Sequence, residues 1–126
     1  MNTDKITEHI IGCAYKVSND LGVGFLEKVY ENALVIELKK QGLHAEVQKP
    51  LVVHYDNQVV GEYFVDILVE KSIVLELKAV KSIDKIHQAQ LLNYLKATGL
   101  KTGLLLNFGT PRLGIKRMIF TTDEHR

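Results

Sequence analysis

Hydrophobic residues at the start of the chain recur at the spacing of an amphipathic helix. Over residues 3–20 they return every three or four positions, which predicts a helix with Thr3 or Asp4 as its N-cap. Gly22 and Gly24 then break the pattern. We therefore expect the first helix to end just before these glycines.

The same spacing resumes after the glycines. It predicts a second helix over residues 25–41, which Gly42 ends. One stripe of this helix should be buried against the rest of the protein. The residues expected in that stripe are Leu26, Val29, Tyr30, Ala33 and Ile36.

The hydrophobic period then changes to two, which is typical of strands. Residues 45–55 predict a strand, and Pro50 within it indicates a sheet edge or a bulge. Turn-forming residues at 56–58 lead to two further strands, at about 59–69 and 73–79. In the strand over residues 45–55, four residues are expected to share a face: Val47, Leu51, Val53 and Tyr55.

The last third of the chain returns to a helix and then to strands. Ser82 is the expected cap of a third helix over about 83–98, which Gly99 ends. Residues 102–108 are apolar almost throughout and predict a strand buried on both faces, and residues 115–121 can add a last one. This order predicts an α/β fold: two helices, an antiparallel meander of three strands, a helix and one or two strands, with a central mixed sheet flanked by helices.

The composition fits one compact domain. Of 126 residues, 46% are hydrophobic and 25% charged, which suffices for one core but not for two. We therefore expect a single domain over 1–126. No signal-like stretch opens the chain, no apolar run reaches the roughly 18 residues of a membrane span, and the only cysteine is Cys13. We expect a soluble, cytoplasmic protein without membrane contact. The net charge of +1 neither requires nor excludes a nucleic-acid partner.

Three charged residues stand within two strands that otherwise resemble core: Asp66, Glu76 and Lys78. If the connecting loop is residues 70–72, Asp66 lies directly opposite Glu76, and all three side chains project from one face. A two-residue loop would instead place Asp66 opposite Leu77. Two carboxylates about 5 Å apart repel by about 3 kcal/mol at an effective dielectric constant of about 20. A positive charge should therefore lie between them.

Two interpretations of this charge cluster stay open at this point. In the plainer one, Lys78 supplies the positive charge, and the three side chains form a solvated salt-bridge cluster on the outer face of a hairpin. In the other, the two converging carboxylates form a hard-oxygen site suited to Mg²⁺ or Mn²⁺.

Polar residues on two of the predicted helices favour the metal site. Glu27 lies at the border of the apolar stripe, from which it can lean toward the sheet, although a first-turn glutamate also complements the helix dipole. His87, Gln90 and Tyr94 share one face of the third helix at i, i+3 and i+7. Taken singly, His87 is more often a surface histidine and Tyr94 a core ring.

The charged triplet and its surroundings resemble the PD-(D/E)xK nuclease superfamily. "VD" at 65–66 precedes "ELK" at 76–78 by ten residues, as in the signature of that superfamily. Val65 replaces the proline of the signature, a position that does no chemistry. "QLLNY" at 90–94 further resembles the Gln-x-x-x-Tyr motif of the branch that includes RecB-like and Cas4-like nucleases.

A second motif resembles a smaller group within the superfamily. "GFLEKVY" at 24–30 matches the motif that names the GxxExxY proteins, and the likeness runs over residues 6–120. Both resemblances imply a restriction-endonuclease-like core, in agreement with the predicted element order. The biological substrates of the GxxExxY group are largely unassigned, so the likeness does not imply a pathway.

The resemblance also implies roles for particular residues. Asp66 and Glu76 would hold a divalent cation, Mg²⁺ or Mn²⁺, together with the backbone carbonyl of Leu77. Glu27 would complete or orient the ligand shell. Lys78 would position or deprotonate the attacking water, or stabilise charge on the phosphorus, and the sequence does not choose among these roles.

The remaining residues of the motifs would serve the substrate. Gln90 and Tyr94 would brace the site or contact the sugar-phosphate backbone. Nearby lysines are candidates for contacts with flanking phosphates, although each is more simply a solvated surface charge. These lysines are Lys81, Lys85, Lys96 and Lys101.

The resemblance implies a metal-dependent nuclease that hydrolyses phosphodiester bonds of nucleic acid, and we expect DNA rather than RNA as the substrate. The alternative is a non-catalytic module that kept the nuclease fold and holds nucleic acid or a protein partner. A plain structural domain with a salt-bridged hairpin is a third reading. A homodimer formed through the exposed sheet edge or the first helix is a further hypothesis.

Overall fold

A computed structural model describes residues 1–121 of the chain. These residues form three helices and five strands in the predicted order, with ends that differ from the predicted ones by at most two residues. The elements are α1 (Thr3–Leu21), α2 (Glu27–Lys40), β1 (Ala45–Tyr55), β2 (Gln58–Val69), β3 (Ile73–Lys78), α3 (Lys85–Thr98), β4 (Thr102–Asn107) and β5 (Gly114–Ile119). The predicted α/β class is confirmed.

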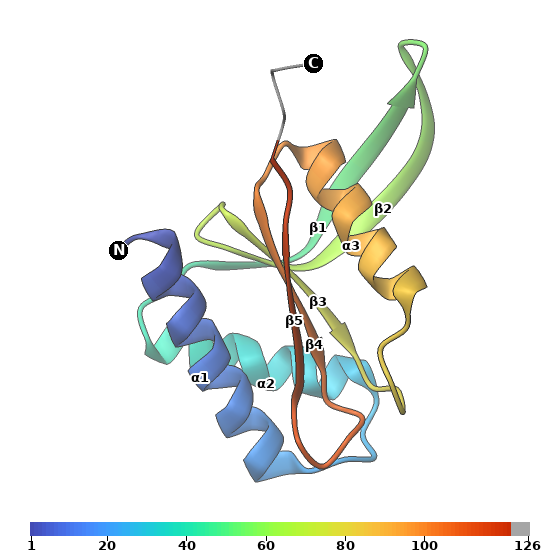
Figure 1. Cartoon of the computed structure of the whole chain (residues 1–126). Coiled ribbons are helices and arrows are strands. Elements are labelled where there is room, and N and C mark those ends of the chain that lie inside the picture. Colours follow the sequence, from blue (N-terminus) through green and yellow to red (C-terminus); the bar gives the residue numbers. More distant parts are fainter. Residues whose placement is uncertain (122–126) are drawn as a thin grey trace.

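The strands form one mixed sheet in the order β1-β2-β3-β4-β5. Neighbours are antiparallel except β3 and β4, which run parallel because α3 carries the chain from the end of one to the start of the other. α1 and α2 cover one side of the sheet and α3 covers the other (Figure 1). None of the helices in 1–121 has the length and apolar character that crossing a membrane requires.

The core has two layers because β3 and β4 are buried on both faces. Leu75 and Leu77 of β3 pack in the cluster formed with α1 and α2, whereas Val74 packs in the cluster formed with α3. All residues of β4 are buried, as the apolar run at 102–108 predicts. Since side chains alternate along a strand, Glu76 points toward the side of α3.

The hairpin of β2 and β3 has the predicted three-residue loop. Val69 faces Ile73, so that residues 70–72 connect the two strands. β2 pairs with β3 only over residues 67–69, and its earlier part leaves β3 and continues with β1 as a two-stranded arm (Figure 1). We call β1 and the part of β2 before residue 67 the arm.

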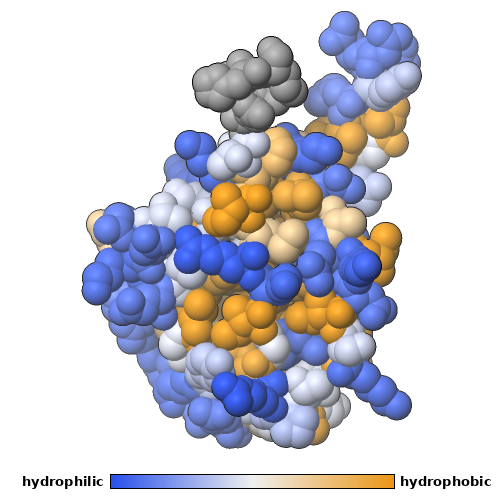
Figure 2. Space-filling model, in the orientation of Figure 1, coloured by the Kyte–Doolittle hydropathy of each residue, from blue (hydrophilic) through white to orange (hydrophobic). Residues whose placement is uncertain are grey.

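The arm exposes apolar side chains. Figure 2 shows them beneath a hydrophilic tip. β1 is an edge strand of the sheet, as Pro50 indicates. The exposed large apolar residues of the arm are Val47, Val52, Tyr55, Val59, Val60, Tyr63 and Phe64.

The predicted buried stripe of α2 is wrong in part. Leu26, Val29 and Ile36 are 79%, 38% and 56% exposed. Leu26 is the N-cap and lies outside the helix, so it belongs to no helical row. The buried row instead consists of Tyr30, Leu34 and Leu38, which are four residues apart and face the sheet and α1.

The helix caps also differ from the predicted ones. The side chain of Asn2, rather than Thr3 or Asp4, accepts a hydrogen bond from a backbone N–H in the first turn of α1. Asp84, rather than Ser82, caps α3 in a capping box with His87. The cap of α1 thus lies one or two residues before the predicted one, and the cap of α3 lies two residues after it.

β1 does not keep the predicted alternation. Gln48 has a φ of 49°, and the register with β2 shifts between Val53 and His54. These two irregularities rotate the side chains between faces. Leu51 is buried as expected, but Val47 and Tyr55 are 47% and 76% exposed.

Candidate active site

Two carboxylates occupy the fork at which β2 and β3 part. Backbone pairing stops at Ile67 and Leu75. Just beyond this pair, the carboxylates of Asp66 and Glu76 act as acceptors in place of backbone carbonyls. The backbone N–H of Asp66 donates to Oε2 of Glu76 (3.1 Å), and the N–H of Leu77 donates to Oδ2 of Asp66 (2.8 Å). The structure thus brings together the two acidic residues that the hairpin register predicts to be opposite each other. We call Asp66 and Glu76 the acid pair.

Burial sets the protonation of the acid pair. Glu76 is 5% exposed, and burial, followed by the neighbouring charge of Asp66, raises its pKa to about 8. Burial also raises the pKa of Asp66, although the N–H of Leu77 opposes this change. The charge of Lys78 lowers the pKa of both acids without cancelling the effect of burial. Without a cation, Glu76 is therefore mostly protonated at neutral pH, and this proton relieves the repulsion expected from the sequence.

Lys78 extends from a strand end that is held firmly. Its backbone carbonyl accepts a hydrogen bond from the N–H of Phe108 (2.8 Å). The side chain of Asn107, 2% exposed, accepts from the N–H of Val80 (3.0 Å) and donates to its carbonyl (2.9 Å). Gly109 is required beside them because an added Cβ would lie 2.3 Å from the backbone of Val80. This clamp fixes the part of β3 that carries Lys78.

Residues 24–30 position the start of α2. Gly24 has a φ of 107°, which favours glycine. The ring of Tyr30 stacks on Phe108 with centroids 4.8 Å apart, and its hydroxyl donates to the carbonyl of Gly22 (2.6 Å). Glu27 is exposed in the first turn of the helix that these contacts fix. Its charge adds to the effects that raise the pKa of both members of the acid pair.

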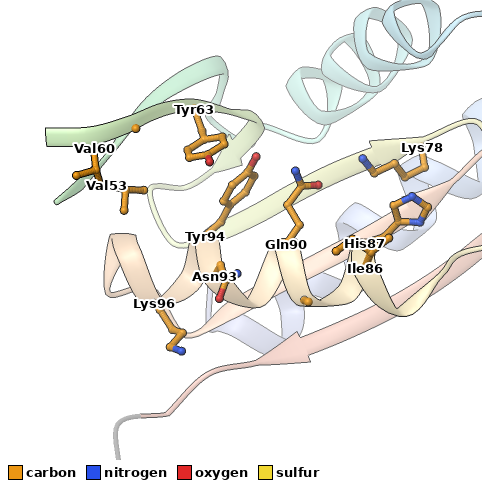
Figure 3. Close-up of a pocket in the computed structure, with 12 residues that line it drawn as sticks. Val53, Val60, Tyr63, Lys78, Ile86, His87, Gln90, Asn93, Tyr94 and Lys96 are labelled. Carbon is orange, nitrogen blue, oxygen red and sulfur yellow. The ribbon is translucent and has the colours of Figure 1, made fainter. Parts of the chain in front are cut away.

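α3 and β2 line a groove of about 710 Å³ next to Lys78. His87, Gln90 and Tyr94 all line it, as the spacing along the predicted helix indicates, and Figure 3 shows them along one side of α3. The ring of Tyr94 lies 5.7 Å from that of Tyr63. Burial, followed by the charges of the acid pair, raises the pKa of Tyr94 to about 12. Its hydroxyl therefore keeps its proton at neutral pH and can donate a hydrogen bond.

The fork fits a hard divalent cation by its donor set. Within 1–121 no three His, Cys, Asp or Glu side chains converge as a metal cluster. Each acid, however, uses one oxygen for a backbone N–H, and Oδ1 of Asp66 and Oε1 of Glu76 accept no hydrogen bond from the described residues. The N–H of Leu77 points into the fork, and the carbonyl of the same extended residue points the same way. Such oxygen atoms are the ligands that Mg²⁺ and Mn²⁺ take.

Two polar residues near the acid pair are absent from the sequence prediction. Glu31 is 4% exposed and accepts a hydrogen bond from the side chain of Gln48 (2.8 Å). A signal for Glu31 was present, since it follows Glu27 by four residues and so lies on the same side of the helix. No comparable signal marks Gln48, because its position depends on a local break in β1.

Comparisons with known proteins found a family and a similar fold. A family model described as PD-(D/E)XK nuclease superfamily matches residues 4–118. Among solved structures, the chain is similar to "Crystal structure of SSO0001", with a TM-score of 0.59 and 24% identity over 77% of this chain and 51% of that one. The chain thus spans about half the length of that protein, and the likeness is one of fold. No curated protein matches the sequence.

Proposed function

The chain belongs to the PD-(D/E)XK nuclease superfamily, and on this premise we propose that it is a metal-dependent nuclease that hydrolyses phosphodiester bonds of DNA. The observation that carries the proposal is the acid pair itself. Glu76 is buried and Asp66 half-buried, both with raised pKa values, at a break in the backbone pairing. Their burial costs free energy, which the hydrogen bonds from two backbone N–H groups offset only in part. A site that takes a cation accounts for both features.

The acid pair would hold Mg²⁺ or Mn²⁺, with the carbonyl of Leu77 as a third oxygen. When bound, such an ion polarises the scissile phosphate and lowers the pKa of a water molecule. Glu27, which is exposed and whose charge acts on both acids, would add negative charge or orient this water. For the ion to bind, Glu76 must release its proton, so cation and proton compete at this carboxylate.

Lys78 and the groove would act on the substrate. The ammonium group of Lys78, held on a fixed strand end, would position the attacking water or neutralise charge that develops on the phosphate. The hydroxyl of Tyr94, which keeps its proton at neutral pH, and the amide of Gln90 would donate hydrogen bonds to the sugar-phosphate backbone. Tyr63 offers a ring on which a base can stack, and Lys96 is a charge for a flanking phosphate.

A DNA cleavage assay tests the proposal. The protein is incubated with single-stranded, duplex and branched DNA in the presence of Mg²⁺ or Mn²⁺, and Glu76→Ala is compared with the parent. Glu62→Ala is the matched control because it removes an exposed carboxylate from β2, away from the fork. We expect cleavage by the parent and by the control only. If no substrate is cut, or if Glu76→Ala cuts as well as the parent, the enzymatic proposal fails.

A non-catalytic binding module is the second candidate. The apolar lining of the groove favours it, because Val53, Val60 and Ile86 can hold a base or an apolar side chain of a protein without any chemistry. Calorimetric titration with Mn²⁺ separates the candidates, since a pure binding module need not take up the ion. Membership of the GxxExxY group, a cytoplasmic location and a homodimer stay predictions, the last of which light scattering tests.

A further inference from the structure

Gln48 has an unfavourable backbone conformation in the middle of a strand. Its φ of 49° is in the left-handed region, which residues with a Cβ avoid. The other non-glycine residues of 1–121 with positive φ lie in the two hairpin turns, where such angles are ordinary: Asp56, Asn57, Glu70 and Lys71. Some contact made by Gln48 must therefore offset the cost.

That contact is with a buried acid on α2. The side-chain amide of Gln48 donates to Oε1 of Glu31 (2.8 Å), whose residue is only 4% exposed. The other oxygen of Glu31 accepts from the ammonium group of Lys28 (2.5 Å). Each carboxylate oxygen of Glu31 thus accepts from one donor, and the two hydrogen bonds fix the orientation of the carboxylate.

The irregular residue stands across from the acid pair. Pairing between β1 and β2 includes Val47 with Ile67 and Lys49 with Val65, and it skips Gln48, whose counterpart is Asp66. Burial raises the pKa of Asp66, and the charge of Glu31 raises it further. Because Gln48 stands opposite Asp66 and its side chain is bonded to Glu31, the geometry itself places the Glu31 carboxylate on the side of Asp66.

We propose that Gln48 and Glu31 are positioning residues for the acid pair. Gln48, through its irregular backbone, fixes the Glu31 carboxylate beside Asp66. From there the negative charge of Glu31 strengthens the binding of a divalent cation by the acid pair without itself being a ligand. This inference rests on the proposed metal-dependent function.

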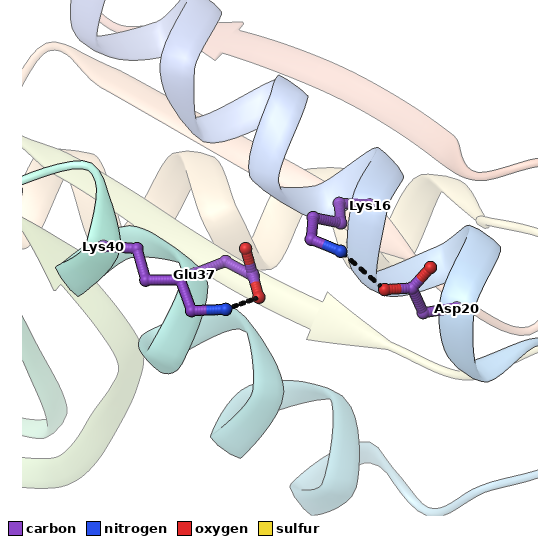
Figure 4. Close-up of polar contacts among 4 residues, drawn as sticks. All are labelled: Lys16, Asp20, Glu37 and Lys40. Atoms are coloured by element: carbon purple, nitrogen blue, oxygen red, sulfur yellow. Dashed lines mark hydrogen bonds and ion pairs between the residues drawn. The ribbon is translucent and has the colours of Figure 1, made fainter.

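A second glutamate on α2 shows what an ordinary ion pair on this helix looks like. Glu37 accepts from Lys40 (3.2 Å), also three residues away, and faces α1 where Lys16 and Asp20 form a pair of their own (Figure 4). It is only partly buried and is held by no residue with an irregular backbone. Glu31 differs from it in both respects, which favours a role in the site over a role in the helix.

The test combines Mn²⁺ calorimetry with the melting temperature of the full chain measured without metal. Gln48→Gly and Gln48→Ala both remove the side-chain amide, but only glycine relieves the strain of the positive φ. Glu31→Gln removes the charge and keeps the shape, and Glu37→Gln is the matched control on the same helix. We expect the first three variants to bind Mn²⁺ about 10-fold more weakly than the parent and the control to bind it equally well.

Stability should follow a different order from Mn²⁺ affinity. Without metal, Gln48→Gly should melt about 3 °C higher than Gln48→Ala because glycine adopts the positive φ without strain. If Gln48→Gly binds Mn²⁺ like the parent, or if Glu31→Gln does, the inference is overturned while the proposed function stands. If the parent itself takes up no Mn²⁺, both fall together.

Discussion

β3 has two neighbours in the sheet, and its two junctions differ. Toward β4 the register is continuous from Ile73 opposite Thr102 to Lys78 opposite Asn107. Toward β2 pairing covers only residues 67–69 and then gives way to the acid pair. The closed junction fixes the strand, and the open junction leaves one oxygen of each carboxylate without a hydrogen bond from the described residues. A site at a strand needs both, because a loosely held strand would not keep the ligands in place.

The two junctions also contribute to stability in opposite directions. Leu104 and Leu106 of the closed junction are fully buried, and burial of such side chains stabilises a fold by about 1.5 to 3 kcal/mol each. In the open junction Glu76 is buried and Asp66 half-buried, and burial of a carboxylate costs free energy unless it is paired or protonated. This contrast is what we expect of a fork that holds a ligand, as proposed above.

Closing the fork should have the largest effect on metal binding. In the double variant Asp66→Val with Glu76→Val, apolar side chains replace both carboxylates. We expect Mn²⁺ uptake in calorimetry to disappear and the free energy of unfolding without metal to rise by about 1 to 4 kcal/mol, as for other buried charges replaced by apolar groups. A variant that loses stability would indicate that the carboxylates support the fold through their bonds to backbone N–H groups.

A cavity in the closed junction should lower stability and leave Mn²⁺ affinity unchanged. Leu104→Ala removes buried apolar volume at the pairing with Leu75, and we expect the free energy of unfolding to fall by about 2 to 5 kcal/mol. Mn²⁺ affinity, measured at a temperature at which the variant is folded, should match that of the parent. An affinity that falls along with stability would contradict the separation of the two junctions.

The open junction should also make stability depend on pH. The pKa of Glu76 rises from 4.5, its ordinary value, to about 8 in the folded chain. Between these values the folded state binds a proton that the unfolded state lacks, so the free energy of unfolding falls as pH rises, by at most about 1.4 kcal/mol per pH unit. Denaturant unfolding without metal at pH 5 to 9 measures this slope.

Two variants separate the contributions to this slope. Glu76→Gln, which cannot ionise, should flatten it, and Asp66→Asn should raise the melting temperature without metal because it removes a charge beside Glu76. A slope that persists in Glu76→Gln would assign the pH dependence to other groups. An unchanged melting temperature in Asp66→Asn would favour the solvated salt-bridge cluster over the metal site.

The groove should give the smallest effect. Tyr63→Ala removes one ring of the Tyr63 and Tyr94 pair, and we expect binding of single-stranded DNA to weaken by about 1 to 3 kcal/mol. Fluorescence anisotropy with a labelled oligonucleotide measures the change, and Tyr63→Phe, which keeps the ring, should bind like the parent. If Tyr63→Ala binds the oligonucleotide as tightly as the parent does, the groove does not bind the substrate.

The acid pair could be predicted from the sequence because a regular strand alternates strictly. β3 and the last part of β2 have no irregularity, so counting back from the three-residue loop places Asp66 opposite Glu76. The same reasoning failed in β1, where Gln48 interrupts the alternation. Period-two patterns thus predict faces only where the backbone is regular.

The rest of the site depends on contacts between distant parts of the chain. Asn107 clamps the loop after β3 from a different strand, and Gln48 reaches Glu31 from a different element. A glutamate pattern on α2 does not reveal which acid is buried: Glu27 matches the motif and is exposed, whereas Glu31 is buried. These relations arise from tertiary packing, which the local spacing of residues does not determine.

The most direct test of the central claim is a crystal of the parent protein soaked in Mn²⁺ and measured for anomalous scattering. We predict one ion at the fork, bound by Oδ1 of Asp66, Oε1 of Glu76 and the carbonyl of Leu77. A soaked crystal in which the fork holds no ion, while both carboxylates keep their bonds to the backbone N–H groups, would contradict this prediction.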